Sequence, residues 1–88
     1  MSWRIVFTAG ADKNLDKLDK NSKKLIQDYL NNKVLKRNHP KELGKALLRE
    51  FKGLWRYRVD QFRIICEIKE QELVILVVKI GNRMSVYE

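Results

Sequence analysis

The chain has 88 residues, which is enough for one domain with one core and too few to enclose a large cofactor as well. Its hydrophobic fraction of 44% is ordinary for a folded protein and argues against a disordered chain. Nineteen Lys and Arg against eleven Asp and Glu give a net charge of +8, which attracts phosphate backbones, acidic proteins or anionic membranes, unless it serves solubility alone.

Cysteine and histidine usage limits the chemistry further. Cys66 is the only cysteine, so no internal disulfide forms, and with His39 as the only histidine we expect no metal site and no cofactor. No apolar run reaches the roughly 18–20 residues of a membrane span, and the N-terminus lacks the apolar core of a signal peptide. We therefore expect a cytoplasmic protein without membrane contact, folded as a single domain over residues 1–88.

The first half of the chain predicts one strand followed by two helices. Residues 3–7 place their large apolar side chains at every second position, which is typical of a half-buried strand. Thr8 can cap the helix that follows, and Asn21-Ser22 breaks the helical pattern and can cap a second helix. That helix should end before Asn38-His39-Pro40, because a residue before proline avoids the helical region. The apolar positions of the two helices are Ala11, Leu15 and Leu18, and then Leu25, Ile26, Tyr29, Leu30 and Val34.

The second half predicts a sheet. Residues 41–54 lack periodicity and suggest a loop or short turn, and residues 73–78 are continuously apolar, as expected for a central strand covered on both faces. The predicted strands are Trp55 to Val59, Phe62 to Lys69 and Glu72 to Ile80, and residues Arg83 to Tyr87 could add a short last strand. The fold class is therefore α+β in the order β-α-α-β-β-β, with the two N-terminal helices on one face of a mainly antiparallel four-stranded sheet and a more open, basic face opposite.

Several arginines should converge on that open face. Strand alternation puts Arg56 and Arg58 on one side, about 7 Å apart, and Arg63 follows across a tight two-residue connection. Arg83 and Tyr87 lie beyond the end of the central strand. Guanidinium groups this close repel one another unless they bind an anion, and phosphate fits the guanidinium fork. With an aromatic ring to stack on an unpaired base, the pattern favours single-stranded RNA.

A plainer interpretation remains open at this point. Glu50, Asp60 and Glu67 can neutralise the arginines on a merely solvated face, and Tyr87 can be an ordinary C-terminal anchor in the core.

Two stretches carry a resemblance to a known family. Residues 53–68, GLWRYRVDQFRIICEI, and residues 77–83, VVKIGNR, followed by Val86-Tyr87, resemble the C-terminal half of the RelE/ParE toxin superfamily, on the RelE side. The resemblance implies a RelE-like fold and a metal-independent endoribonuclease that cleaves mRNA in the ribosomal A site, inhibits translation and is encoded beside an antitoxin.

The resemblance also assigns residues. By position, Arg56 and Arg58 match the family's paired basic residues, Arg63 its phosphate-binding arginine, Arg83 the arginine after the glycine, and Tyr87 the terminal tyrosine. Arg63, helped by Arg58, would stabilise the charge on a phosphorane, Arg83 would act on the leaving oxygen, and Tyr87 would orient the base or transfer a proton. Lys52 and Lys79 join Arg56 as the predicted RNA-binding residues.

The sequence departs from the family pattern in two places. Some members have lysine where Arg56 and Arg58 stand, and many related sequences have histidine where Asn82 stands. Because an arginine is a poor general base, the base stays unassigned among Tyr87, Lys52, Glu67 and a group on the ribosome.

Three functions therefore follow from the resemblance. The first is the RNA-cleaving toxin, the second a ParE-like inhibitor of DNA gyrase without catalysis, and the third a catalytically weakened homologue that binds its antitoxin. In each case we expect a cognate acidic, amphipathic antitoxin as partner, a monomer when the toxin is free and a hetero-oligomer with the antitoxin. The first function adds the ribosome and mRNA as partners.

Overall fold

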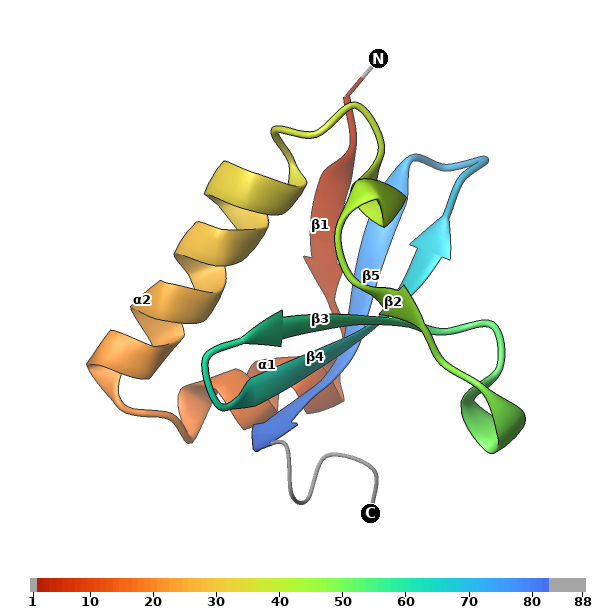
Figure 1. Cartoon of the computed structure of the whole chain (residues 1–88). Coiled ribbons are helices and arrows are strands. Elements are labelled where there is room, and N and C mark those ends of the chain that lie inside the picture. The colour runs from red at the N-terminus through yellow and green to blue at the C-terminus, as the bar shows by residue number, and fades with distance from the viewer. Residues whose placement is uncertain (1, 83–88) are drawn as a thin grey trace.

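A computed structural model describes residues 2–82, and its elements follow the predicted order (Figure 1). Two single-turn helices and one very short strand occupy the stretch that was expected to be a loop. The elements are β1 (Arg4–Phe7), α1 (Ala9–Asp16), α2 (Lys20–Tyr29) with a π-helical turn (Leu30–Val34), a 3-10 turn (Pro40–Glu42), β2 (Lys45–Ala46), a 3-10 turn (Arg49–Phe51), β3 (Trp55–Val59), β4 (Phe62–Lys69) and β5 (Val74–Asn82).

The strands form one sheet in the order β1-β5-β4-β3-β2. β1 pairs parallel with β5, and the other pairings are antiparallel. The predicted α+β class is confirmed, but the described sheet has five strands rather than four, because β2 pairs with the start of β3 inside the predicted loop 41–54. The short strand predicted from Arg83 to Tyr87 lies outside the described residues.

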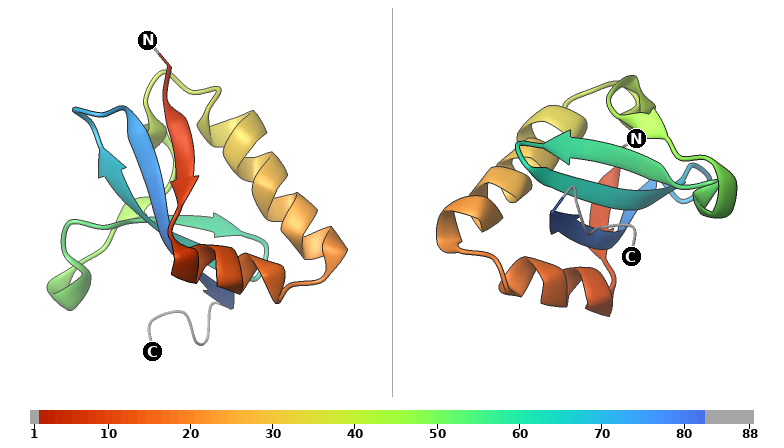
Figure 2. Two further views of the ribbon diagram at one scale, coloured as in Figure 1. Left: turned by 180° about the vertical axis from the view of Figure 1, so that it is seen from behind. Right: turned by 60° about the horizontal axis from the view of Figure 1, so that its bottom comes forward.

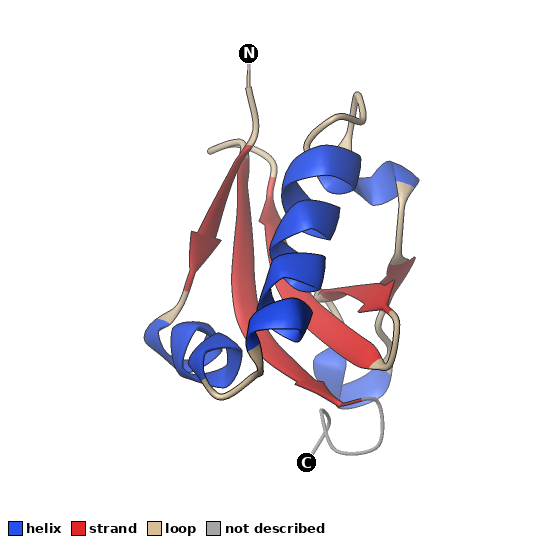
Figure 3. Ribbon diagram, turned by 90° about the vertical axis from the view of Figure 1, so that its left-hand side faces the viewer, coloured by secondary structure: helices blue, strands red, loops and turns tan. Residues whose placement is uncertain are grey.

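Both helices lie over one face of the twisted sheet (Figures 2 and 3). Thr8 caps α1 as predicted, because its Oγ1 accepts a hydrogen bond from the amide of Ala11 at 3.1 Å. The predicted cap at Asn21-Ser22 is wrong, since α2 begins at Lys20 with Asp19 as its N-cap. Amides in the first helical turn need no intrahelical acceptor, so cap-type residues are also tolerated inside that turn.

The core lies between these helices and the sheet. Tyr57, Ile64 and Ile75 are fully buried on the helix-covered face. β5 is interior in the sheet as expected, but it is not covered on both faces throughout, because Leu76 and Val78 remain partly exposed. The other core members are Ala11, Leu15, Ile26, Leu30, Val34, Val59, Phe62, Cys66, Val77 and Ile80.

Two hydrogen bonds fasten the loop before β2 to β3. The hydroxyl of Tyr57 donates to the carbonyl of Pro40 at 2.6 Å, and the indole Nε1 of Trp55 donates to the carbonyl of Leu43 at 2.7 Å. Because both donors belong to β3, they hold the incoming chain where β2 can pair with that strand.

Candidate nucleic-acid interface

The sheet register gathers five cations on the face opposite the core. Arg58 lies directly opposite Arg63, and Lys45 lies directly opposite Arg56. Residues paired in this way project to the same side of a sheet, so the row that begins with Lys45 and Arg56 continues through Ile65 to Lys79. We call this surface the cationic face and define it by Lys45, Arg56, Arg58, Arg63 and Lys79.

The two cross-strand pairs bring like charges together. Opposed side chains have Cβ atoms about 4.5–5.5 Å apart, and like charges at that separation destabilise the pairing. Among residues 2–82, neither Arg56 nor Arg58 has a carboxylate oxygen within 4.0 Å. Glu50, Asp60 and Glu67 therefore form no ion pair with these two arginines, and no carboxylate in that part of the chain competes with an anionic ligand for them at this distance.

The row of Arg58 and Arg63 ends at a glycine. Gly81 pairs with Arg63 on the β5 side, and because glycine has no side chain, one flank of Arg63 is not covered by a neighbour in its own row. A phosphate that approaches the Arg58–Arg63 pair thus meets two guanidinium groups from adjacent strands. This arrangement suits a transition state with two negative charges.

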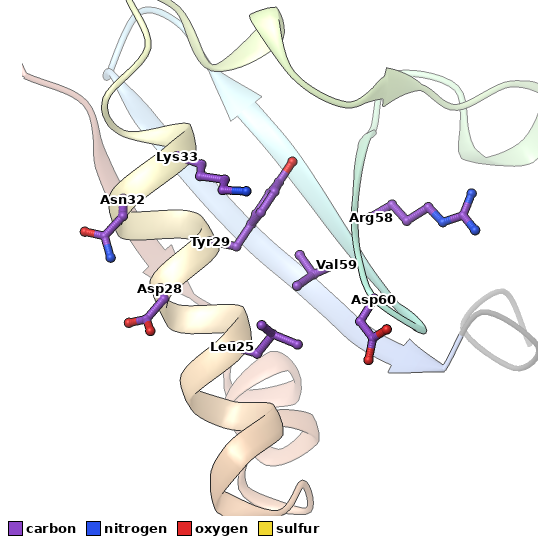
Figure 4. Close-up of a pocket in the computed structure, with 8 residues that line it drawn as sticks. All are labelled: Leu25, Asp28, Tyr29, Asn32, Lys33, Arg58, Val59 and Asp60. Atoms are coloured by element: carbon purple, nitrogen blue, oxygen red, sulfur yellow. The ribbon is translucent and has the colours of Figure 1, made fainter.

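A groove runs beside this face, between α2 and the turn that joins β3 to β4 (Figure 4). Its volume is about 420 Å³. Arg58 is one of its lining residues, although the guanidinium group at the end of this side chain points away from α2 (Figure 4). The remaining lining residues are Leu25, Asp28, Tyr29, Asn32, Lys33, Val59 and Asp60.

Comparison with known proteins decides the family. A sequence model described as the ParE toxin of the type II toxin–antitoxin system parDE matches residues 5–87, which is almost the whole chain. The chain belongs to the RelE/ParE toxin superfamily. A search of curated proteins found no match.

Solved structures of toxins share the fold. The RelBE2 toxin–antitoxin complex of Mycobacterium tuberculosis contains a chain that matches with a TM-score of 0.84 at 20% identity, covering 94% of this toxin and 93% of that chain. The intact RelBE complex of E. coli matches with a TM-score of 0.70 at 17% identity, over 93% and 96% of the two chains. YafQ of E. coli matches with a TM-score of 0.62 at 16% identity, over 94% and 96%.

The structure of the toxin places most of the predicted site residues. It brings Arg56, Arg58, Arg63 and Lys79 together on the cationic face. Lys52 is exposed in the loop before β3 and belongs to neither row of the register. Arg83 and Tyr87 lie outside the described residues.

Sequence reasoning missed Lys45. A two-residue strand has no periodicity to reveal it, and only the pairing of β2 with β3 sets Lys45 opposite Arg56. The signals that were present are Gly44, which permits a backbone with positive φ, and the three cations Lys45, Arg49 and Lys52 that follow it.

Of the groups predicted as possible bases, Lys52 and Glu67 lie within the described chain, and Lys52 is an exposed residue of the loop before β3. Glu67 lies four residues beyond Arg63 along β4, a separation of about 13 Å, and its carboxylate is 3.9 Å from Nζ of Lys69. Tyr57, a phenol between Arg56 and Arg58 in sequence, was not predicted as a base. Tyr57 faces the core, where burial raises the pKa of its phenol and its hydroxyl is engaged by Pro40. Neither Glu67 nor Tyr57 is placed to take a proton from a ligand on the Arg58–Arg63 pair.

Two further features follow from residues 2–82. They contain no cluster of three or more His, Cys, Asp or Glu side chains that could hold a metal ion. None of the helices in this part of the chain is both long enough and apolar enough to cross a membrane.

Proposed function

We propose that this type II toxin is an endoribonuclease that cleaves mRNA in the ribosomal A site without a metal ion and thereby inhibits translation. The observation that carries the proposal is the direct opposition of Arg58 and Arg63, with no carboxylate oxygen within 4.0 Å of Arg58 among residues 2–82. Like charges directly opposite each other destabilise the strand pairing, and a phosphate bound by both arginines would relieve that repulsion.

The proposed reaction is an attack of the RNA 2′-oxygen on the adjacent phosphorus. A base takes the 2′-hydroxyl proton, the bond from phosphorus to the 5′-oxygen breaks, and the departing oxygen receives a proton. Arg63, with Arg58, stabilises the extra negative charge of the phosphorane. Arg83 acts on the leaving oxygen, and Tyr87 orients the base or transfers a proton. Arg56, Lys52 and Lys79 bind the neighbouring backbone.

The partner of the free, monomeric toxin is proposed to be a cognate acidic antitoxin. Two of the similar solved structures are toxin–antitoxin complexes, and a net charge of +8 favours an acidic segment that neutralises the cationic face. The ribosome and mRNA are the proposed cytoplasmic targets.

The decisive experiment incubates the purified full-length toxin with mRNA-programmed ribosomes, with and without EDTA, and maps the new RNA ends. We expect cleavage in both conditions with the wild-type toxin. Arg63→Ala should lower the cleavage rate by about 10²–10³, the usual effect of removing a donor that stabilises transition-state charge. Lys24→Ala, which removes an exposed cation from α2, should cleave like the wild type. Full activity of both Arg63→Ala and Tyr87→Ala would overturn the site.

A second function is favoured by one observation, namely that the matching family is described as the ParE toxin. In that case the chain would inhibit DNA gyrase and perform no catalysis. A supercoiling assay separates the two functions, because inhibition of gyrase together with intact mRNA would replace the nuclease. Normal growth during soluble expression without antitoxin would instead indicate a weakened homologue, which the Arg56, Arg58 and Asn82 departures motivate.

A further inference from the structure

A second recess lies where β2 ends and leaves the rest of β3 without a strand along that edge. Its volume is about 210 Å³, and its wall shares Arg58 with the groove of Figure 4 and with the cationic face. No carboxylate lines this recess, whereas Asp28 and Asp60 line the larger groove. The recess is lined by Tyr29, Gly44, Lys45, Arg56 and Arg58.

The cations of the recess lack acidic partners inside the described chain. Lys45 and Arg56 lie directly opposite each other across β2 and β3, and neither forms an ion pair within residues 2–82. Nε of Arg56 is buried without a hydrogen-bond acceptor. A buried donor without an acceptor costs about 1–3 kcal/mol, so a ligand oxygen that draws this guanidinium outward would relieve both the missing bond and the like-charge repulsion.

The backbone keeps Lys45 in this position. Gly44 has φ of +81°, and a Cβ at this residue would lie 2.4 Å from the carbonyl oxygen of Arg56. The indole bond from Trp55 to Leu43 fixes the residue just before it. The chain therefore approaches β3 more closely than any other residue type would allow, and Lys45 comes directly opposite Arg56 as a result.

We propose that this recess binds one nucleotide of single-stranded RNA adjacent to the scissile phosphate, with Lys45 and Arg56 on its phosphate and the ring of Tyr29 against its base. The inference rests on the proposed nuclease function and extends the RNA path from the Arg58–Arg63 pair around the edge of β3. An acidic peptide is the less favoured occupant. An unpaired base can stack on the Tyr29 ring, and a phosphate meets no repelling carboxylate in the lining of the recess.

The test measures binding without cleavage. A fluorescent single-stranded DNA of about eight nucleotides, within the usual site size for such proteins, lacks the 2′-hydroxyl and serves as the probe. Its affinity for the full-length toxin is measured by anisotropy across a range of salt concentrations. Lys45→Ala should lower the slope of log K against log salt by about 0.7, the value for one lost phosphate contact on a single strand. Lys45→Arg should restore the slope, and Lys24→Ala should leave it unchanged.

A second pair of variants tests the aromatic contact. Tyr29→Phe keeps the ring and should bind like the wild type, whereas Tyr29→Leu should bind about fivefold or more weakly, since stacking on an aromatic side chain contributes that much per base. Tyr29 also packs edge-on against Tyr57, with 6.1 Å between the ring centroids. Thermal unfolding therefore checks that each variant is folded.

The outcomes separate this inference from the nuclease proposal. If Lys45→Ala has the same slope of log K against log salt as the wild type, the recess is not an RNA site, whether or not the wild-type toxin cleaves mRNA. Loss of antitoxin binding by Lys45→Ala, with an unchanged salt slope for the single-stranded DNA probe, would also overturn the inference and assign the recess to the antitoxin. A reduced slope in a toxin that never cleaves mRNA would support the recess and reject the nuclease.

Discussion

Tyr57 combines a buried ring with a hydrogen bond that spans 17 residues of sequence. Its hydroxyl donates to Pro40 at 2.6 Å, and the side chain is fully buried. Tyr57→Phe leaves the carbonyl of Pro40 without this donor, so we expect a loss of about 1–3 kcal/mol in the free energy of unfolding. Urea denaturation measures the loss. Tyr29→Phe, which removes a hydroxyl from the adjoining ring, should cost less, and equal costs would contradict the role given to the bond.

The ionisation of the same phenol makes the stability of the fold depend on pH in the alkaline range. Burial raises the pKa of Tyr57 above its ordinary value, and burial also raises that of Tyr29. The folded protein therefore holds these protons more tightly than the unfolded chain, so their contribution to stability is complete below about pH 10 and is lost as the pH rises above it. The urea concentration at the midpoint of unfolding can be measured from about pH 8 to about pH 11, a range that spans the ordinary tyrosine pKa. With rising pH this midpoint should fall less steeply for Tyr57→Phe than for the wild type.

Cys66 should be chemically silent in the folded toxin. Its side chain is fully buried on the helix-covered face of β4, and burial raises the pKa of the thiol, so the nucleophilic thiolate is scarce at neutral pH. We expect iodoacetamide at pH 8 to modify the protein only after urea unfolds it, as mass spectrometry will show. Rapid modification of the native protein would place the thiol at the surface instead.

At the scale of elements, periodicity predicted the long strands and failed for the short one. β3 and β4 carry alternating side chains, and this alternation in the sequence was enough to predict that Arg56, Arg58 and Arg63 share one face of the sheet. β2 has only two residues, and its pairing depends on the Trp55–Leu43 bond and on the close approach at Gly44, neither of which leaves a pattern in the sequence. Lys45 was missed for the same reason.

Two glycines offer a matched test of that close approach. Gly44 and Gly53 both have positive φ, at +81° and +97°, but a Cβ at Gly53 meets nothing within 4 Å. Gly53→Ala should therefore cost only the backbone strain, about 1–2 kcal/mol. Gly44→Ala adds a clash with the carbonyl of Arg56, and we expect a total of about 2–5 kcal/mol. Chemical denaturation of both variants provides the comparison, and equal losses would mean that β2 can move away without cost.

On the scale of the whole molecule, the helices and the cationic face lie on opposite sides of the sheet. One face buries the core under α1 and α2, and the other carries two rows of like charges. With extents of 33 × 30 × 22 Å, every charge lies within about one Debye length of most others at 0.01 M salt, where that length is about 30 Å. The net charge of +8 therefore opposes folding as a whole at low salt, in addition to the local repulsion at each pair.

Matched variants separate the global repulsion from the local one. Arg58→Gln and Lys24→Gln each remove one positive charge, but only Arg58 stands directly opposite another cation in the sheet. The loss of a directly opposed like charge should stabilise the fold by about 0.2–1 kcal/mol, so Arg58→Gln should melt at a higher temperature than Lys24→Gln at about 0.01 M salt. The difference should shrink as added NaCl shortens the Debye length to about 10 Å near 0.1 M and about 3 Å at 1 M. Equal melting temperatures at low salt would mean that Arg58 and Arg63 already avoid each other in the free toxin, and the argument that their opposition exists to bind phosphate would then lose its physical basis.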